Sequence, residues 1–275
     1  MPITPPKLTT LELSVENHIA RVRLNRPGKA NAMSREVWTD LRSAFDWIDA
    51  TPQARVAIIG GNGAHFTSGI DLAMLAGVAD DVDDDCEGRK RENLRRVILD
   101  LQDSLSSLER CRKPVIAAIH GACIGGGMDL ICCADMRYCS ADAFFSIKEI
   151  DMGMTADVGT LQRLPKLIGD GMARELAYTG RQFAADEAKA IGLVNRVFET
   201  SEALLAGVAQ IATEIAAKSP LAIRGTKEMI VYARDHSVAD SLNYIATWNA
   251  GMLMSADLQE AMMASMQKAT PKFRD

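Results

Sequence analysis

A short unit of strand, glycine-rich turn and helix occurs twice in this chain, and it constrains the fold more than any other feature. The apolar run at 56–59 leads through glycines to residues 68–72, where a helix is expected from near Asp71, and the apolar run at 115–119 leads through glycines to residues 126–130, where a helix is expected from Met128. A helix N-terminus presents unpaired backbone N–H groups, and glycines let a ligand approach them closely. Two such ends that converge would form an oxyanion hole.

The same glycines have other possible uses. A phosphate-binding loop would end in Gly-Lys-Ser or Gly-Lys-Thr, and a dinucleotide-binding loop would spell G-x-G-x-x-G; neither 60–63 nor 121–127 does so. Nucleotide-phosphate motifs are therefore disfavoured. Glycines that only permit close packing of a helix on a strand remain the alternative.

Three carboxylates lie within 29 residues of the most apolar part of the chain: Asp129, Glu149 and Asp157. A carboxylate removed from water is costly unless it is paired, hydrogen-bonded or protonated, and such groups gather where protons are transferred. The cluster therefore predicts an enzyme that moves protons. Taken singly, Asp157 could be a helix N-cap, Asp129 could complement a helix dipole, and Glu149 could form a surface pair with Lys148.

Composition excludes several other functions. The chain has 275 residues, a formal net charge of -5 and a pI near 5.5, so it fits one large domain and has no long-range attraction for nucleic acid. No apolar run approaches the ~18 residues that span a bilayer, and no membrane partner is expected. The six cysteines form no C-x-x-C pairs, which favours reduced thiols over disulfides or a metal site. Without a recognisable leader or a C-terminal Ser-Lys-Leu, a cytoplasmic location is the expectation.

Hydrophobic periodicity outlines the order of elements. It predicts a hairpin at 10–16 and 19–24, strands at 55–59, 114–119, 136–139 and 143–147, and helices after Ser34, from near Asp71, and at 89–110 and 128–134. Residues 80–87 carry six acids and predict a solvated loop. After residue 201 strand signals end, and helices are expected at 201–218, 221–233, 237–253 and 256–267. Their methionine-rich faces would be core or would pack on a second subunit.

Several motifs resemble the crotonase, or enoyl-CoA hydratase/isomerase, superfamily. They are Arg-Leu-Asn-Arg-Pro-x-x-x-Asn-Ala-Met at 23–33, His-Phe-Thr-Ser-Gly-Ile-Asp-Leu at 65–72, Lys-Pro-Val-Ile-Ala-Ala-Ile-His-Gly at 113–121, Gly-Gly-Gly-Met-Asp-Leu at 125–130 and Leu-Gln-Arg-Leu-Pro at 161–165. The stretches at 123–130, 142–149, 156–166, 234–238 and 246–249 are similar to its dienoyl-CoA isomerase branch. The resemblance covers nearly the whole chain.

The resemblance implies a fold and a binding site. The fold would be α/β, with a crotonase-like ββα spiral core and active site over 1–200 and a C-terminal helical region over 201–275 that forms a homotrimer or a dimer of trimers. The thioester carbonyl of an acyl-CoA substrate would lie between the N–H groups of Ile70 and Gly126. Coenzyme A would contact a set of loop residues: Lys29, Ala30, Asn31, Ser68, Gly69, Ile70, Asp71, Leu72 and Gly126. Lys268 or Lys272 of a neighbouring subunit would meet phosphate, and no metal or redox cofactor is expected.

The resemblance also assigns the acids. A typical hydratase of the family has Glu at the positions of Asp129 and Glu149 and Gly at the position of Asp157, so this chain departs at two of the three. The change favours conversion of 3,5-dienoyl-CoA into 2,4-dienoyl-CoA in fatty-acid β-oxidation, with Glu149 and Asp157 as the proton-transfer pair and Asp129 in support. Enoyl-CoA hydration is the alternative; a non-catalytic acyl-CoA-binding or RNA-binding relative is an alternative of another class.

Overall fold

A predominantly parallel sheet forms the centre of the protein. The computed structural model describes residues 4–275, without the side chains at 79 and 81. In the described part, six strands follow the order β1-β2-β3-β4-β6-β9; all neighbours are parallel except the β1–β2 hairpin. Their bounds are β1 (Leu11–Glu16), β2 (Ile19–Leu24), β3 (Val56–Gly61), β4 (Val115–Ile119), β6 (Met136–Ser140) and β9 (Arg196–Phe198). The expected α/β class is confirmed.

A second, smaller sheet stands beside the first. It contains β5 (Ala122–Ile124), β7 (Phe144–Ser146) and β8 (Phe183–Ala184), in the order β5-β7-β8 within the described residues. The sequence prediction treated 121–127 as a turn throughout, which is wrong for β5. Three residues are too few for an alternating pattern to reveal a strand, and only its pairing with β7 makes it one.

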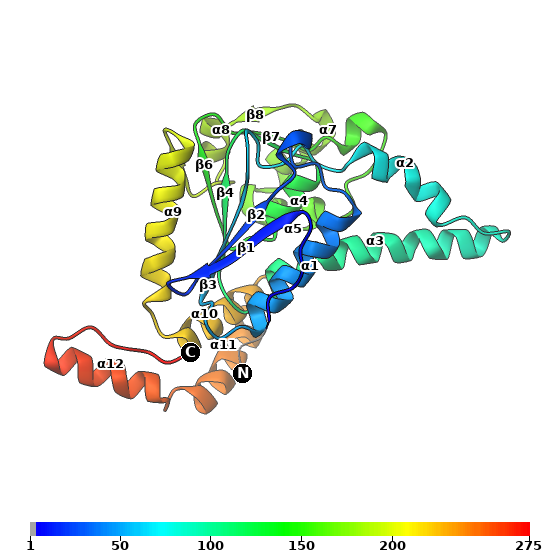
Figure 1. Cartoon of the computed structure of the whole chain (residues 1–275). Helices are drawn as coiled ribbons and strands as arrows, with labels where there is room; N and C mark the ends of the chain where they lie inside the picture. The colour runs from blue at the N-terminus through cyan, green and yellow to red at the C-terminus, as the bar shows by residue number, and fades with distance from the viewer. Residues whose placement is uncertain (1–3) are drawn as a thin grey trace.

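Helices cover both faces of the large sheet (Figure 1). The sequence up to residue 200 contributes α1 (Arg35–Ala50), α2 (Leu72–Asp81), α3 (Glu87–Arg110), α4 (Gly126–Cys132), α5 (Thr160–Arg163), α6 (Pro165–Ile168), α7 (Asp170–Thr179) and α8 (Ala185–Ala190), with 3-10 turns η1 (Pro27–Lys29) and η2 (Glu149–Met152). The remainder contributes α9 (Ser201–Ala216), α10 (Pro220–Ala233), α11 (Val238–Met252) and α12 (Ala256–Gln267).

Alternate residues of the central strands feed two separate cores. Ala57 and Ile59 of β3 belong to the larger core, which also holds the apolar face of α1, whereas Val56 and Ile58 belong to a smaller core beneath α9. This alternation follows from the two-residue repeat of a strand. The apolar face predicted for the helix after Ser34 is confirmed: Val37, Trp38, Leu41, Phe45 and Ile48 are all buried.

Two local predictions need correction. Residues 80–87 are not one loop, because α2 continues to Asp81 and α3 begins at Glu87. Arg89, in the first turn of α3, pairs with Asp84 and Asp85 of the connecting segment. These ion pairs offset the repulsion between neighbouring carboxylates at the start of α3. Helix α4 begins at Gly126, two residues before the predicted start, so that two consecutive glycines form its first turn.

The C-terminal helices differ in how they pack. Helix α9 lies on the large sheet, and α10 is fixed by Lys227, whose ammonium group lies 2.8 Å from Asp135 Oδ2. Helices α11 and α12 extend away from the core (Figure 1), and their only buried side chain among the described residues is Ala264. No described helix combines the length and apolar character needed to cross a bilayer. The six cysteines, which lie between residues 86 and 139, are all free, and all but Cys86 are buried.

Candidate active site

The two glycine-rich segments meet. Thr67 and Cys123 form an isolated parallel bridge, and the Ile124 N–H donates to Thr67 O at 3.2 Å. Just beyond this bridge Gly69 has φ +91°, and a Cβ on it would lie 2.8 Å from Ile124 O and 3.6 Å from Gly126 N. Such contact between backbones requires glycine at 69. The convergence inferred from the repeated unit is therefore present.

Two amide groups at this junction have no partner. Three neighbouring N–H groups are engaged: Gly69 donates to Thr67 Oγ1, Asp71 to Met33 O and Gly125 to Ser146 O. Within residues 4–275, no hydrogen bond is formed by the N–H of Ile70 or of Gly126. Gly126 is buried and Ile70 is half-buried, and two amides without a protein acceptor are suited to bind a carbonyl oxygen.

Glu149 lies directly against the glycine turn. A Cβ on Gly125 would be 3.2 Å from Glu149 Oε1, so the absence of a side chain there makes room for the carboxylate. The surface pair with Lys148 is wrong, because Lys148 pairs with Asp151 instead. Glu149 Oε2 is buried and has no hydrogen-bond partner in the described residues. Burial, reinforced by repulsion from Asp157, raises the pKa of Glu149.

Asp129 is completely buried on α4 and connects two parts of the site. Its Oδ1 accepts a hydrogen bond of 2.6 Å from the Thr160 N–H at the start of α5, while its Oδ2 is buried and unpartnered within the described chain. Burial, and next repulsion from Glu149, raise the pKa of Asp129 to about 7, although the hydrogen bond from Thr160 opposes this. The sequence prediction considered only the dipole of the helix that carries Asp129, and it did not anticipate the hydrogen bond to α5.

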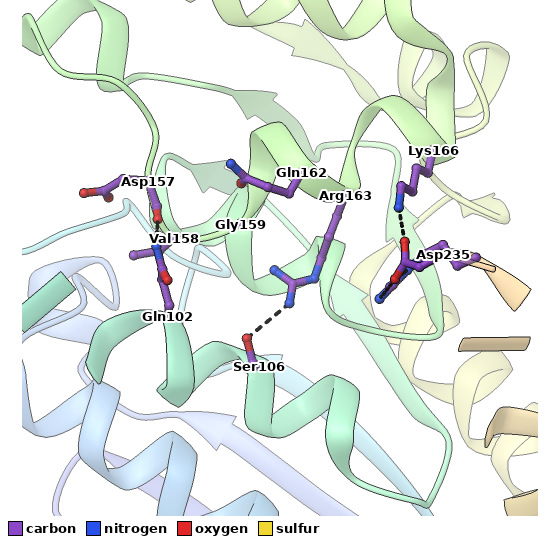
Figure 2. Close-up of a pocket in the computed structure, with 10 residues that line it drawn as sticks. Gln102, Ser106, Asp157, Val158, Gly159, Gln162, Arg163, Lys166 and Asp235 are labelled. Carbon is purple, nitrogen blue, oxygen red and sulfur yellow. Dashed lines mark hydrogen bonds and ion pairs between the residues drawn. The ribbon is translucent and has the colours of Figure 1, made fainter. Parts of the chain in front are cut away.

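Asp157 is not a helix N-cap. The N-cap of α5 is Gly159, and the Thr160 N–H is already bound by Asp129. The backbone carbonyl of Asp157 accepts a hydrogen bond of 2.6 Å from Gln102 Nε2 of α3. In Figure 2 its carboxylate points away from Gln162 and Arg163. The residue as a whole is exposed, yet partial burial of the carboxyl group raises the pKa of Asp157.

The three acids interact as one group. Asp129 experiences the charges of both Glu149 and Asp157, and Glu149 experiences that of Asp157. The structure thus brings together acids that come from α4, η2 and the segment before α5. Repulsion between neighbouring carboxyl groups disfavours ionisation of all of them at once, and an acid and a base that act in one reaction need such a difference in protonation. No metal-binding group of acids, histidines or cysteines occurs among the described residues.

An ion-pair network supports the segment that carries Asp157. Arg163 and Arg234 of this network line a cavity of about 350 Å³ (Figure 2), together with Gln102, Ser106, Asp157, Val158, Gly159, Gln162, Lys166 and Asp235. Arg163 contacts both oxygens of Glu109, at 3.2 and 3.0 Å, and Arg234 contacts the same carboxylate. Burial alone would raise the pKa of Glu109, but the two arginines lower it overall.

Sequence reasoning missed Gln102 and Glu109. Both are single polar residues on the long helix α3, and nothing in the local pattern distinguishes them from residues on a solvated face. Gln102 contacts Asp157, which lies 55 residues further along the chain, and Glu109 contacts Arg163, which lies 54 residues further along.

The predicted coenzyme A contacts fall on two adjacent loops. Ser68 N–H donates to Ala30 O at 3.0 Å, which joins the segment of Lys29 and Ala30 to that of Ser68–Leu72. Asp71 caps α2 through Ala73 N–H and pairs with Arg26 at 3.0 Å. Lys268 and Lys272 belong to the end of α12 and the tail after it, which Figure 1 places away from α4.

The site thus combines two amide groups that have no partner among the described residues with three carboxyl groups whose pKa values are raised. The chain belongs to the enoyl-CoA hydratase/isomerase family, whose sequence profile matches residues 14–275.

Two curated relatives and one solved structure give the detail. The chain is 46% identical, over 98% of its length and 99% of the relative's, to the peroxisomal Delta(3,5)-Delta(2,4)-dienoyl-CoA isomerase of Arabidopsis thaliana. It is 47% identical, over 92% of its length and 78% of the relative's, to the mitochondrial Delta(3,5)-Delta(2,4)-dienoyl-CoA isomerase of Homo sapiens. The enoyl-CoA hydratase of Bacillus anthracis superposes with a TM-score of 0.88 at 30% identity, covering 97% of this chain and 99% of that one. The expected crotonase-like fold is confirmed.

Proposed function

We propose that this chain is an acyl-CoA double-bond isomerase that converts 3,5-dienoyl-CoA into 2,4-dienoyl-CoA. The observation that carries the proposal is the meeting of Asp129, Glu149 and Asp157 beside the unpaired N–H groups of Ile70 and Gly126. The names of the relatives at 46% and 47% identity support the same reaction.

The oxyanion hole lowers the barrier to enolate formation. The thioester oxygen accepts hydrogen bonds from the N–H groups of Ile70 and Gly126. When a proton leaves C2, negative charge moves onto this oxygen, where the two donors stabilise it more strongly than they stabilise the neutral carbonyl. Loss of one such donor typically lowers the rate by about 10²–10³.

Glu149 and Asp157 carry out the two proton transfers. Glu149 lies against Gly125, next to the donor Gly126, so it faces C2 and removes the proton there as the base. Electron density then spreads along the conjugated chain, and Asp157 in its protonated form returns a proton to C6. The bonds C3=C4 and C5=C6 become C2=C3 and C4=C5. Exposure of Asp157 lets it exchange protons with water and reset the pair.

The environment of Asp129 favours isomerisation over hydration. One oxygen of its carboxyl group is held by the Thr160 N–H at 2.6 Å, and its pKa of about 7 leaves it partly neutral at physiological pH. A hydratase needs two carboxylates that hold and activate a water. Asp129 instead supports the pair through its charge, and repulsion between Asp129 and Glu149 helps to keep one of them protonated.

The test is a direct comparison of substrates. Purified protein is mixed with 3,5-dienoyl-CoA, and formation of the more red-absorbing 2,4-conjugated thioester is followed by absorbance; hydration of 2-enoyl-CoA is measured in parallel. Rapid isomerisation with slow or no hydration supports the proposal. Rapid hydration without isomerisation would establish the hydratase, whereas acyl-CoA binding with neither reaction, or salt-dependent RNA binding, would establish a non-catalytic relative.

Assembly belongs to the same proposal. Exposed apolar side chains gather on α11, α12 and the turn between them: Val238, Leu242, Met252, Leu253, Met254, Met262, Met263 and Met266. Apolar exposure of this extent is typical of an interface, so we expect a homotrimer or a dimer of trimers. Light scattering coupled to gel filtration measures the mass; a monomer at micromolar concentration contradicts the expectation.

The cellular setting is a separate prediction. Cytoplasmic β-oxidation is expected from the sequence, while the relatives' names assign those proteins to peroxisomes and mitochondria. Immunolocalisation in the source cell tests the compartment, and the proposed reaction does not depend on it.

A further inference from the structure

A second cavity lies on the opposite side of the large sheet from α1. It has a volume of about 230 Å³ and is enclosed between strands β2 and β3 and helix α9, with Arg21, Val22, Arg23, Ile58, Gly60, Leu205 and Ala209 as its lining. Figure 1 shows α9 along this face of the sheet. Met33 and Trp38, which contact Gly126 in the candidate active site, belong to the core on the other face.

Two arginines without partners line this cavity. Arg21 and Arg23 are two residues apart on β2, so their side chains leave the same face of the sheet. Among residues 4–275 neither side chain makes an ion pair or a hydrogen bond, and Arg21 Nη1 is buried without any acceptor. Both residues are half-buried, and a guanidinium group keeps its proton under all physiological conditions, so neutralisation cannot offset the burial of Arg21 Nη1. Two like charges here require an anion or water as a partner.

The acid that lies opposite Arg23 on the neighbouring strand is bound to other residues. Glu12 of β1 is the cross-strand neighbour of Arg23, but its two oxygens accept hydrogen bonds from Asn25 Nδ2 and Asn62 Nδ2, each at 2.9 Å. These amides lie at the ends of the strands, and they hold the carboxylate outside ion-pair distance of either arginine. The positive charge of the cavity is therefore not cancelled by the hairpin.

Glycine at 60 creates the space. Gly60 is the neighbour of Arg23 on β3, within a strand that is otherwise suited to large apolar residues such as Ile58. A Cβ on Gly60 would meet only Ala118 O, at the ordinary distance of 3.5 Å, and its φ lies outside the left-handed region. Neither backbone conformation nor close packing requires glycine here, whereas a larger side chain would fill the cavity.

We propose that this cavity binds a small organic anion, a carboxylate or phosphate that carries a short apolar portion. Arginine matches both oxyanions because its planar group donates two parallel hydrogen bonds. The apolar portion would contact Ile58, Leu205 and Ala209. This site is separate from the candidate active site and does not depend on the reaction proposed for it.

Calorimetric titration of the full-length protein tests the site with two probes, inorganic phosphate and butyrate, in a low-chloride buffer. We expect saturable binding of at least one probe, with one site per chain. The double variant Arg21→Gln/Arg23→Gln should weaken it by at least about tenfold, since hydrogen bonds to charged groups are the strongest contacts available. Arg91→Gln, which alters an exposed arginine of α3, is the matched control and should bind as the parent does.

Gly60→Val fills the cavity without changing the charge and should also abolish binding; if it does not fold, as judged by circular dichroism, the arginine variants decide. Binding of phosphate alone or of butyrate alone identifies the anion, and binding of both supports a shared oxyanion site. Isomerase activity should persist in the double arginine variant. No saturable binding of either probe, or undiminished binding in the double variant, overturns the proposal.

Discussion

Substitution of Gly69 by alanine tests the oxyanion hole without touching any acid. The added Cβ would lie 2.8 Å from Ile124 O, well inside normal contact distance, and the φ of +91° is unfavourable for a residue with a side chain. Relief of the overlap requires the backbones to separate by roughly 0.5–1 Å. Ile70 follows Gly69, and the Gly126 nitrogen lies 3.6 Å from the added Cβ, so separation of the two backbones would move the proposed donors away from one shared oxygen.

The expected loss follows from that displacement. A misplacement of about 1 Å lowers catalytic rates by about 10²-fold, and complete loss of one donor costs about 10²–10³ in kcat. Left-handed strain adds roughly 1–2 kcal/mol of destabilisation. We therefore expect Gly69→Ala to lower kcat for isomerisation by at least about 10²-fold with a smaller change in KM, while the protein remains folded.

The assay is steady-state formation of 2,4-dienoyl-CoA, with urea denaturation measured alongside. The matched control is Gly171→Ala in α7, where a Cβ would meet no atom within 4 Å and the helix should be slightly stabilised. A folded Gly69→Ala protein with kcat within about threefold of the parent would refute the reasoning on the oxyanion hole.

Three further predictions concern acids. Asp157→Asn should lower kcat by at least about 10², whereas Asp151→Asn, which alters an exposed acid of η2, should leave it nearly unchanged; equal activities in the dienoyl-CoA assay contradict the two-acid shuttle. The pKa of Asp129 is raised in the folded state, so its protonated form contributes to the free energy of unfolding. This contribution is complete below about pH 4 and is lost as pH rises towards 7. Asp129→Asn should flatten that decline in urea midpoints between pH 4 and 8, and an unchanged pH profile shows that Asp129 is not the group responsible. Glu109→Gln should cost roughly 3 kcal/mol of stability, because two partly buried arginines lose their partner; Glu87→Gln, an exposed helix pair, should cost less than about 0.5 kcal/mol, and similar costs for both would show that the network is not stabilising.

Long periodic elements were predictable because their burial pattern follows from residues that are close together in the sequence. The apolar face of α1 and the buried strands β3 and β4 appear as predicted, since helices and strands repeat with fixed periods. Short elements were harder to predict from the sequence. Strand β5 exists only through pairing with β7, and α4 begins at Gly126 because the turn before it is fixed by contact with Gly69 and Glu149.

The sequence by itself determined the alternation of strands and helices, the twice-repeated glycine turn and the three acids in apolar surroundings, because each of these is a property of neighbouring residues. Tertiary structure alone decided what those residues do. It placed Gly69, the residue before Ile70, against Ile124 and Gly126. It directed the Thr160 N–H to Asp129 and not to Asp157, and it brought Gln102 of α3 into a hydrogen bond with the backbone of Asp157. These contacts join segments far apart in the chain, and the pKa values of the acids follow from the burial and mutual repulsion that such contacts impose.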